Sequence, residues 1–189
     1  MTLTCLRTCS HLKPGTYCEL QCIYPLLRCD DNSSPRDSNL FRFSHDAREA
    51  SALINTPLDA VASYASYLNA AGFENVVETR YKLPSGPWPK DKRMKLIGAF
   101  EMHNLLRGLS GMSLRMFSKG FGWTREEIEI YLAGVRKDIQ NMSYHTYWDL
   151  YVLYHFPFLP PSHLLGRSPR QALRTPMTCS NMLVRYDHC

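Results

Sequence analysis

The chain has 189 residues, of which 44% are hydrophobic and 21% are charged, so it can bury a core and lacks the composition of a disordered or fibrous protein. Its formal net charge is +5, but residues 1–155 carry 18 basic and 16 acidic groups, so most of the chain is nearly neutral. This balance does not favour nucleic-acid binding, and the one basic cluster, within residues 90–95, is interrupted by Asp91.

The N-terminal region predicts the end of a helix, a turn and a strand. Residues 2–11 are expected to be helical, and the pair Pro14 and Gly15 then turns the chain. Residues 17–24 alternate between apolar and polar side chains, which predicts a strand whose polar face lines a cavity. The apolar face carries Cys18, Leu20 and Cys22, and the opposite face carries Glu19 and Gln21.

Seven cysteines are present, and their odd number does not fit a closed set of disulfides. The N-terminus has no apolar stretch of a secretory signal, so a reduced cytoplasmic or nuclear setting is expected. The early cysteines form no CxxC pair, which favours small buried hydrophobic residues over zinc ligands. No apolar run reaches the length of a membrane span, so no association with a membrane is expected.

Two helices are predicted in the next part of the chain. Residues 30–38 have the composition of a surface loop, and a helix is expected from about Asp37 to Leu53. Thr56 and Pro57 then supply an N-cap and a first-turn proline for a second helix. An apolar stripe continues this helix until Gly72, where a left-handed C-terminal cap is expected.

Residues 75–83 form the next predicted strand, which ends at Pro84. The segment 91–122 has a helical pattern but contains several glycines, so two short helices with Met-rich surfaces are predicted in place of one long helix. The glycines concerned are Gly98, Gly108, Gly111 and Gly120.

The C-terminal part begins with the best-marked helix. Thr124 and Glu127 form a capping box, and the apolar stripe that follows consists of Ile128, Leu132, Val135 and Ile139. Residues 144–154 are rich in aromatic and β-branched side chains, which predicts a closing strand. Residues 156–189 hold five of the twelve prolines and no sustained period, so an irregular, disordered tail is predicted there.

Four runs of sequence carry a resemblance to a known family. They lie between His11 and Tyr154 in the order of the family and cover about three quarters of the chain. The runs are HLKPGTYCELQ, CDDNSSPRDSNL, AGFENVVETRYKLPSGPWPKD and GFGWTREEIEIYLAGVRKDIQNMSYHTYWDLYVLY. On these runs the chain resembles the C-terminal portion of the LaeA-like fungal methyltransferases, which use S-adenosylmethionine and are associated with secondary metabolism.

The resemblance implies an α/β fold class, namely the C-terminal part of a doubly wound, Rossmann-like methyltransferase fold with a helical lid insertion and without its N-terminal half. Residues 17–24 would be the fifth strand of that fold, 75–83 the sixth, and 148–154 the antiparallel seventh strand between them. Residues 1–155 would then form the partial domain, followed by the tail 156–189. In such sheets the connections after the strands shape the substrate side.

Candidate site residues follow from this placement. His103 is a candidate general base and Glu19 a second catalytic candidate, because methylation of a hydroxyl requires that a proton be removed. The candidates for binding the substrate are Gln21, Tyr24, Trp88 and Trp123. Each has a structural alternative: Glu19 is solvated at the end of a sheet, the tryptophans fill the core, and His103 is an exposed helical residue. No cofactor-binding residue or metal ligand is assigned.

Two functions remain open at this point. The first is an S-adenosylmethionine-dependent methyltransferase that acts on a small-molecule acceptor in its complete form. The family holds the methyl donor at a glycine-rich turn and an acidic residue that this chain does not show, so its status as an enzyme is left open. The alternative is a non-catalytic remnant, or a regulatory module that binds a protein partner through the exposed edge of its sheet.

Overall fold

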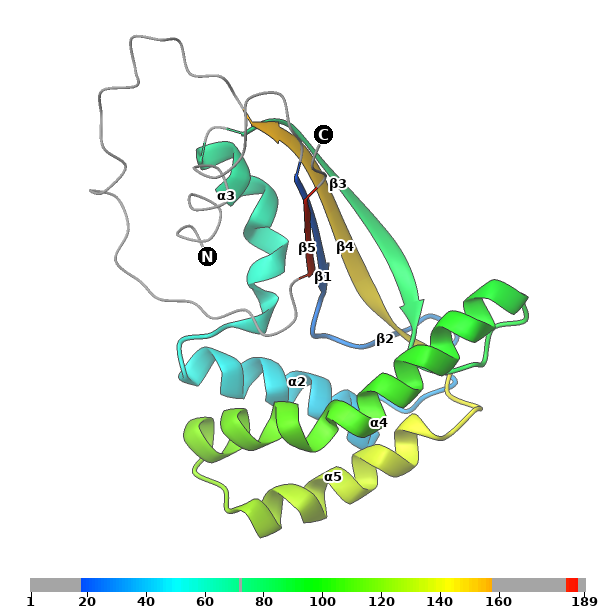
Figure 1. The fold of residues 1–189 in the computed structure, drawn as a ribbon. Coiled ribbons are helices and arrows are strands. Elements are labelled where there is room, and N and C mark those ends of the chain that lie inside the picture. Colours follow the sequence, from blue (N-terminus) through cyan, green and yellow to red (C-terminus); the bar gives the residue numbers. More distant parts are fainter. Residues whose placement is uncertain (1–17, 72, 158–182, 187–189) are drawn as a thin grey trace, which may run out of the picture. The chain divides into compact units, whose positions relative to one another are not determined.

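The computed structural model describes residues 18–71, 73–157 and 183–186 (Figure 1). The helix predicted at residues 2–11 and the cap predicted at Gly72 lie outside the described residues. Among those that are described, no helix is both long and apolar enough to cross a bilayer. The elements in chain order are β1 (Cys18–Ile23), β2 (Arg28–Cys29), α2 (Asn39–Leu53), the 3-10 helix η1 (Leu58–Ser63), α3 (Tyr64–Ala70), β3 (Phe73–Pro84), α4 (Lys92–Gly120), α5 (Arg125–Ile139), β4 (Thr146–Pro157) and β5 (Leu183–Tyr186).

The strand order confirms the arrangement that the resemblance implies. The sheet has the order β2-β4-β1-β5, and β3 also pairs with β4. The last long strand, β4, therefore has β1 and β3 as neighbours, as expected for a seventh strand between the fifth and the sixth. On β1, Leu20 and Cys22 are buried while Glu19 and Gln21 are partly exposed, so the predicted alternation of faces is also confirmed.

The far edge of β1 differs from the expectation. Residues 183–186, which fall within the predicted irregular tail, form β5 and pair antiparallel with β1, with Cys18 opposite Tyr186 and Gln21 opposite Leu183. The strand β4 also continues to Pro157, past the predicted boundary at residue 155. The edge that we expected to be exposed therefore finds its hydrogen-bonding partner within the chain.

The chain divides into two compact units, and the long strands β3 and β4 pass from one to the other at residues 80–81 and 150–151. One unit consists of residues 23–59 and 81–150, and in it α2, α4 and α5 pack on one another (Figure 1). Its core is formed by buried aliphatic and aromatic side chains from these helices and from the start of β4. They include Leu40, Phe41, Leu105, Leu109, Phe117, Leu132, Val135 and Trp148.

The helix α5 begins as predicted. The Thr124 hydroxyl accepts a hydrogen bond from the Glu127 backbone N–H at 3.2 Å, and the Glu127 carboxylate accepts one from the Thr124 backbone N–H at 2.8 Å. This reciprocal capping box satisfies two backbone donors that the first turn of a helix leaves unpaired. The predicted stripe is buried, from Ile128 at 1% exposure to Ile139 at 5%.

A helical segment does follow Thr56, as η1 and α3, but its predicted N-cap and the predicted division of the segment 91–122 were wrong. The segment after Thr56 starts as the 3-10 helix η1, and the Leu58 N–H is capped by the Ser51 hydroxyl at 3.1 Å, so Thr56 is not the N-cap. The segment 91–122 forms the single helix α4 in place of two short ones. A continuous buried stripe through Leu105, Leu109 and Phe117 stabilises α4, and this burial outweighs a cost of up to about 1 kcal/mol for each glycine.

Candidate functional site

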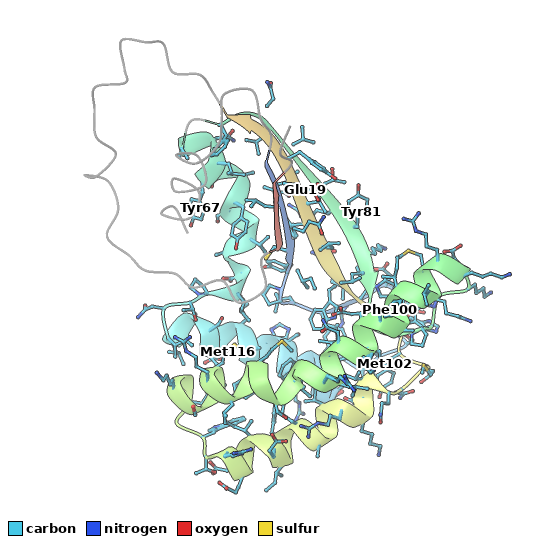
Figure 2. All side chains as sticks on the ribbon, in the orientation of Figure 1. Glu19, Tyr67, Tyr81, Phe100, Met102 and Met116 are labelled. Carbon is cyan, nitrogen blue, oxygen red and sulfur yellow. The ribbon has the colours of Figure 1, made fainter. Side chains whose placement is uncertain are left out.

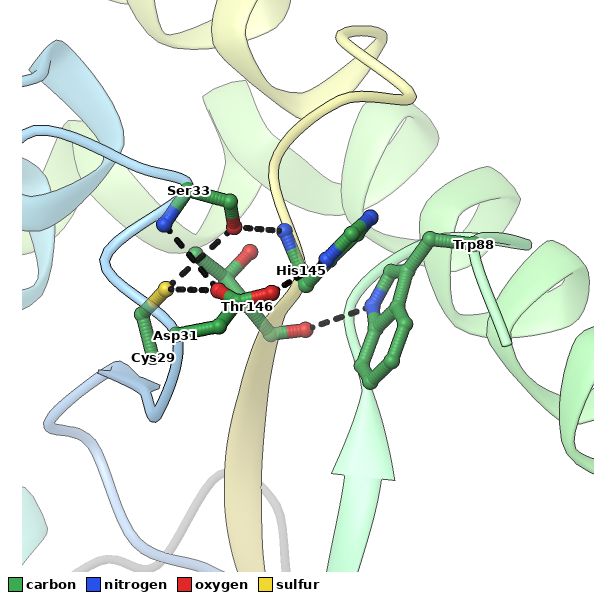
Figure 3. A network of polar contacts seen from close by, with 6 residues as sticks. All are labelled: Cys29, Asp31, Ser33, Trp88, His145 and Thr146. Atoms are coloured by element: carbon green, nitrogen blue, oxygen red, sulfur yellow. Dashed lines mark hydrogen bonds and ion pairs between the residues drawn. The ribbon is translucent and has the colours of Figure 1, made fainter. Parts of the chain in front are cut away.

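A network of polar contacts joins three segments that are far apart in the sequence (Figure 3). They are β2 with the loop that follows it, the turn after β3 that contains Trp88, and the entry to β4 at His145 and Thr146. The loop after β2 turns at Asn32, whose φ of 55° is left-handed, a conformation that asparagine tolerates. Ser33 then donates its backbone N–H to Asp31 Oδ1 at 3.0 Å, which fixes the carboxylate at the tip of the loop.

Asp31 and His145 form the centre of this network. His145 Nδ1 lies 2.5 Å from Asp31 Oδ2, and the His145 backbone N–H donates to the Ser33 hydroxyl at 2.8 Å. An ionised carboxylate can only accept, so the proton of the neutral imidazole is on Nδ1. Hydrogen bonds from His145, Ser33 and the Cys29 thiol hold the pKa of Asp31 well below its usual range. The carboxylate is therefore ionised at neutral pH.

Trp88 holds the imidazole from the side of the turn after β3. Its ring centroid lies 5.0 Å from that of His145, with the two planes tilted by 32°, and its Nε1 donates to the Thr146 carbonyl at 2.9 Å. The Ser85 hydroxyl donates to the same carbonyl at 2.9 Å. The GPWP run, which lies within one of the four runs that carry the family resemblance, thus places an aromatic ring against His145.

The resulting arrangement is an oriented imidazole. Its Nδ1 is committed to Asp31, one face is held by Trp88, and no described residue bonds to Nε2. The His145 side chain is 41% exposed, so a molecule from solution can reach it. A histidine with one nitrogen bonded to a carboxylate and the other free can accept a proton from a substrate.

A second set of charges lies beside the network. The Tyr147 hydroxyl donates to Asp30 Oδ1 at 2.7 Å, and Lys82 pairs with the same carboxylate. Hydrogen bonds from Lys82 and Tyr147 lower the pKa of Asp30. Arg28 pairs with Asp149 at 2.9 Å. These contacts tie β2 and the loop after it to the ends of β3 and β4, where the network sits.

The predicted site residues are not gathered in one place. Trp88 belongs to the network described above. Trp123 packs in an aromatic cluster with Phe117 and Tyr131, at centroid distances of 5.3 and 5.2 Å, as a residue of the core does. His103 is exposed on α4 and makes no hydrogen bond or ion pair with the described part of the chain.

The candidates near β1 are partly exposed. The Gln21 side-chain amide donates to the Glu19 carboxylate, so these two predicted residues bond to each other. The Tyr24 backbone N–H donates to the Asp149 carbonyl at 2.8 Å. Glu19, Gln21 and Tyr24 therefore stay predictions, without a contact that assigns them a role.

His145 was missed because its partner is 114 residues away in the sequence. A signal was available once the strand order had been inferred. Asp31 lies after the segment that the resemblance implies is the fifth strand, and His145 lies just before the segment 148–154, which it implies is the seventh. An antiparallel strand between two parallel ones starts at the edge of the sheet where its neighbours end. This placement puts the two side chains at the same edge, although the sequence alone did not predict that they pair.

A buried carboxylate, Glu101 on α4, was also not predicted. The residue is 9% exposed, and burial raises the pKa of its carboxyl, against a smaller opposing effect of a hydrogen bond from Asn104. One side-chain atom, the indole nitrogen of Trp148 on β4, is buried without a hydrogen-bond partner in the described part of the protein. No group of three or more potential metal ligands occurs among the described residues.

The described residues do not fit S-adenosylmethionine at a glycine-rich turn. The connection after β1 reads Tyr-Pro-Leu-Leu and contains no glycine. The connection after β3 contains Gly86, but its carbonyl packs against α4, since a Cβ placed on Gly98 would lie 2.0 Å from that oxygen. Neither connection is a glycine-rich turn of the kind that holds the donor in the family.

Comparison with curated proteins finds fungal methyltransferases and regulators. Probable methyltransferase tdiE of Emericella nidulans is 30% identical over 160 residues, which is 84% of this chain and 50% of tdiE. Methyltransferase pytC of Aspergillus terreus is 32% identical, over 78% of this chain and 46% of pytC. Secondary metabolism regulator laeA of Aspergillus fumigatus is 26% identical, over 77% of this chain and 39% of laeA.

These relatives confirm the resemblance to LaeA-like fungal methyltransferases of secondary metabolism, and with the mixed helices and strands they fit an α/β methyltransferase fold. The chain spans about half the length of the curated relatives tdiE and pytC that it matches. No family model matches the chain. No solved structure matches it either.

Proposed function

We propose that this chain, a relative of the LaeA-like fungal methyltransferases, belongs to a protein that transfers a methyl group from S-adenosylmethionine to a small-molecule acceptor of fungal secondary metabolism. The observation that supports this function is the match to tdiE and pytC, both named as methyltransferases, over 160 and 149 residues. Since the described residues do not fit the donor, their proposed part in the reaction concerns the acceptor.

His145 is the proposed general base. A hydroxyl that takes up a methyl group must lose its proton, and Nε2 of His145 can accept that proton while Nδ1 stays bonded to Asp31. The ionised Asp31 then stabilises the imidazolium that forms, because opposite charges attract at this short distance. Asp31 and Trp88 act as positioning residues, since they hold the ring without touching the acceptor.

This assignment replaces His103 as the strongest candidate base. His103 stands on an exposed helix surface and has no carboxylate partner among the described residues, whereas His145 has one at 2.5 Å. The lid and substrate-binding roles predicted for Trp123 also lose support, because its ring lies in an aromatic cluster with Phe117 and Phe121. Trp88 is the predicted residue that keeps a place beside the proposed base.

The test uses the complete protein to which this chain is proposed to belong, with donor labelled in its methyl group and a panel of hydroxylated aromatic acceptors. Labelled product is expected, and His145→Gln is expected to lower its rate by about 10²-fold or more. His103→Gln is the matched control and is expected to leave the rate unchanged. Product formed equally well by His145→Gln would overturn the role of His145.

The alternative is a non-catalytic module that regulates secondary metabolism. The observation that favours it is that laeA, one of the relatives, is named a regulator. Calorimetric titration of the same complete protein with S-adenosylmethionine separates the two functions. Micromolar binding supports the methyltransferase, while a folded protein that neither binds the donor nor yields product supports the module.

A cytoplasmic or nuclear location is proposed for either function. It is supported by the odd number of cysteines, which does not fit a closed set of disulfides.

A further inference from the structure

The helix α4 has an exposed apolar stripe on the side opposite to its buried residues. Its buried side consists of Gly98, Glu101, Leu105, Leu109, Ser113 and Phe117. On the other side Phe100 is 67% exposed, Leu96 is 58% exposed and Leu114 is 40% exposed. Figure 2 shows Phe100 on α4. Large side chains this exposed and in line on one helix are a common mark of a surface that another molecule covers.

The charges along α4 are of one sign. The helix contains six basic residues and one acidic residue, Glu101, which is buried. Two of the basic residues, Arg93 and Arg107, lie on the same stripe as Phe100 because they are seven residues away on either side. Neither arginine has a hydrogen bond or an ion pair with the described residues. The stripe is therefore both apolar and positively charged, and no described residue pairs with its two arginines.

The spacing of the stripe is that of a coiled-coil seam. Arg93, Phe100, Arg107 and Leu114 are spaced by seven residues and take the first core position of the heptad, called a. Leu96 and His103 take the second core position, d. The next d position is Ser110, whose hydroxyl is bonded by Arg136 of α5 at 2.6 Å. The open part of the seam therefore runs from Arg93 to Arg107, with Leu114 beyond it.

We propose that this seam, formed by Arg93, Leu96, Phe100, His103 and Arg107, binds an amphipathic helix of a partner protein that carries acidic residues opposite the two arginines. Charged residues at a core position select a partner with the opposite charge, because an unpaired guanidinium in an apolar seam is costly to desolvate. Leu96 and Phe100 supply the apolar contacts between the two charge pairs.

Two other occupants fit the seam less well. In a second copy of this chain, a parallel pairing would place each arginine against itself, so like charges would repel. An antiparallel pairing would place each arginine opposite a d position, where Leu96, His103 and Ser110 supply no carboxylate. On an anionic membrane, cations are favoured at the sides of an apolar face. Here Arg107 lies between Phe100 and Leu114 on the centre line, where insertion would bury its charge.

The probe is a labelled three-heptad peptide with Leu at its d positions and Glu at the a positions that face Arg93 and Arg107. The control peptide has Lys in place of Glu at these positions. Fluorescence anisotropy with the full chain is expected to give at least tenfold tighter binding of the acidic peptide. The double variant R93E/R107E is expected to reverse this preference, a result that misfolding cannot produce.

Removal of the apolar contacts provides the second measurement. L96S/F100S is expected to weaken binding of the acidic peptide at least tenfold, whereas Ile130→Ser, at a side chain on α5 that is 77% exposed, is expected to leave it unchanged. Circular dichroism verifies that each variant is folded.

Three results would overturn the proposal. The first is equal binding of the two peptides, or binding of neither. The second is self-association of the chain that L96S/F100S abolishes, measured by sedimentation. The third is binding to phosphatidylserine vesicles that the same variant abolishes, in the absence of peptide binding.

Discussion

Two surfaces of the same compact unit differ in whether their polar groups are bonded to other described residues. In the network around Asp31 and His145, carboxylate, imidazole, hydroxyl and indole are bonded to one another by segments far apart in the sequence. On the seam of α4, Arg93 and Arg107 have no partner in the described chain although they lie beside exposed apolar side chains. The first surface is organised by the fold, and the second depends on something outside it.

This difference separates two kinds of functional surface. A group that acts on a substrate must be held in one orientation before the substrate arrives, so its partners lie within the protein. A group that recognises a partner can remain free until the partner supplies the opposite charge. Substitutions in the network are therefore expected to change stability and chemistry, while substitutions in the seam change binding alone.

The largest effect is expected where α4 passes the turn that carries Trp88. A Cβ at Gly98 would lie 2.0 Å from the Gly86 carbonyl oxygen, so Gly98→Ala must displace backbone and is expected to cost about 3 kcal/mol or more. Gly111→Ala is the control, because a Cβ there meets nothing within 4 Å and alanine favours the helix. Urea denaturation measures the stability of both variants. Equal stabilities of Gly98→Ala and Gly111→Ala would show that the turn does not depend on this contact.

A smaller loss is expected at Trp88 itself. Trp88→Phe keeps an aromatic ring beside His145 but removes the hydrogen bond from Nε1 to the Thr146 carbonyl. The loss of one such bond in a partly buried site is expected to cost about 1 kcal/mol. Thermal unfolding with calorimetric detection measures it, and Trp123→Phe in the separate aromatic cluster shows what a change of ring size alone does.

The Asp31 carboxylate is expected to stabilise the fold above mildly acidic pH. Its pKa is lowered in the folded state, so its contribution is present above the unfolded pKa, about 4, and is lost as the pH falls through and below that value. Asp31→Asn is therefore expected to be less stable than the original chain at pH 6 and nearly equal to it in strong acid. Denaturation at a series of pH values tests this dependence.

Glu101 is expected to have the opposite effect on the pH dependence of stability. Burial raises its folded pKa, so the chain loses stability as the pH rises from the unfolded value, about 4.3, through the raised one. Glu101→Gln cannot ionise and is expected to be more stable than the original chain at pH 7, with no gain at pH 4. The stabilities of Asp31→Asn and Glu101→Gln, each relative to the original chain, are expected to change with pH in opposite directions. A change in the same direction would contradict the contrast between the bonded and the buried carboxylate.

Local signals predicted much of this fold. The capping box at Thr124 and the stripe that follows it determine α5 through contacts within the helix itself. The alternation of faces on β1 was predicted for the same reason, since each side chain reports its own environment. The continuity of α4 was not predicted. The glycine at position 98 is explained by the contact with Gly86, which lies outside the helix, and the local sequence does not show that contact.

The candidate site was harder to predict than the fold. His103 was chosen as a base from its residue type, but nothing nearby in the sequence could show that His145 has a carboxylate partner 114 residues away. The order of the strands contained that information, because it places the end of β1 and the start of β4 at one edge of the sheet. A pair that depends on topology becomes predictable only after the topology is inferred.

The smallest effect on stability is expected at the centre of the seam. Phe100 is 67% exposed, and phenylalanine and serine have similar helix propensities, so Phe100→Ser is expected to change the free energy of unfolding by less than about 0.5 kcal/mol. The same substitution removes the largest apolar contact offered to a partner helix. Denaturation of Phe100→Ser is compared with that of Phe117→Ser, because the Phe117 ring is fully buried. The comparison tests whether Phe100 is exposed in the folded chain. A large loss of stability for Phe100→Ser would mean that the chain itself covers this side chain, and the contrast between the two surfaces would then fail.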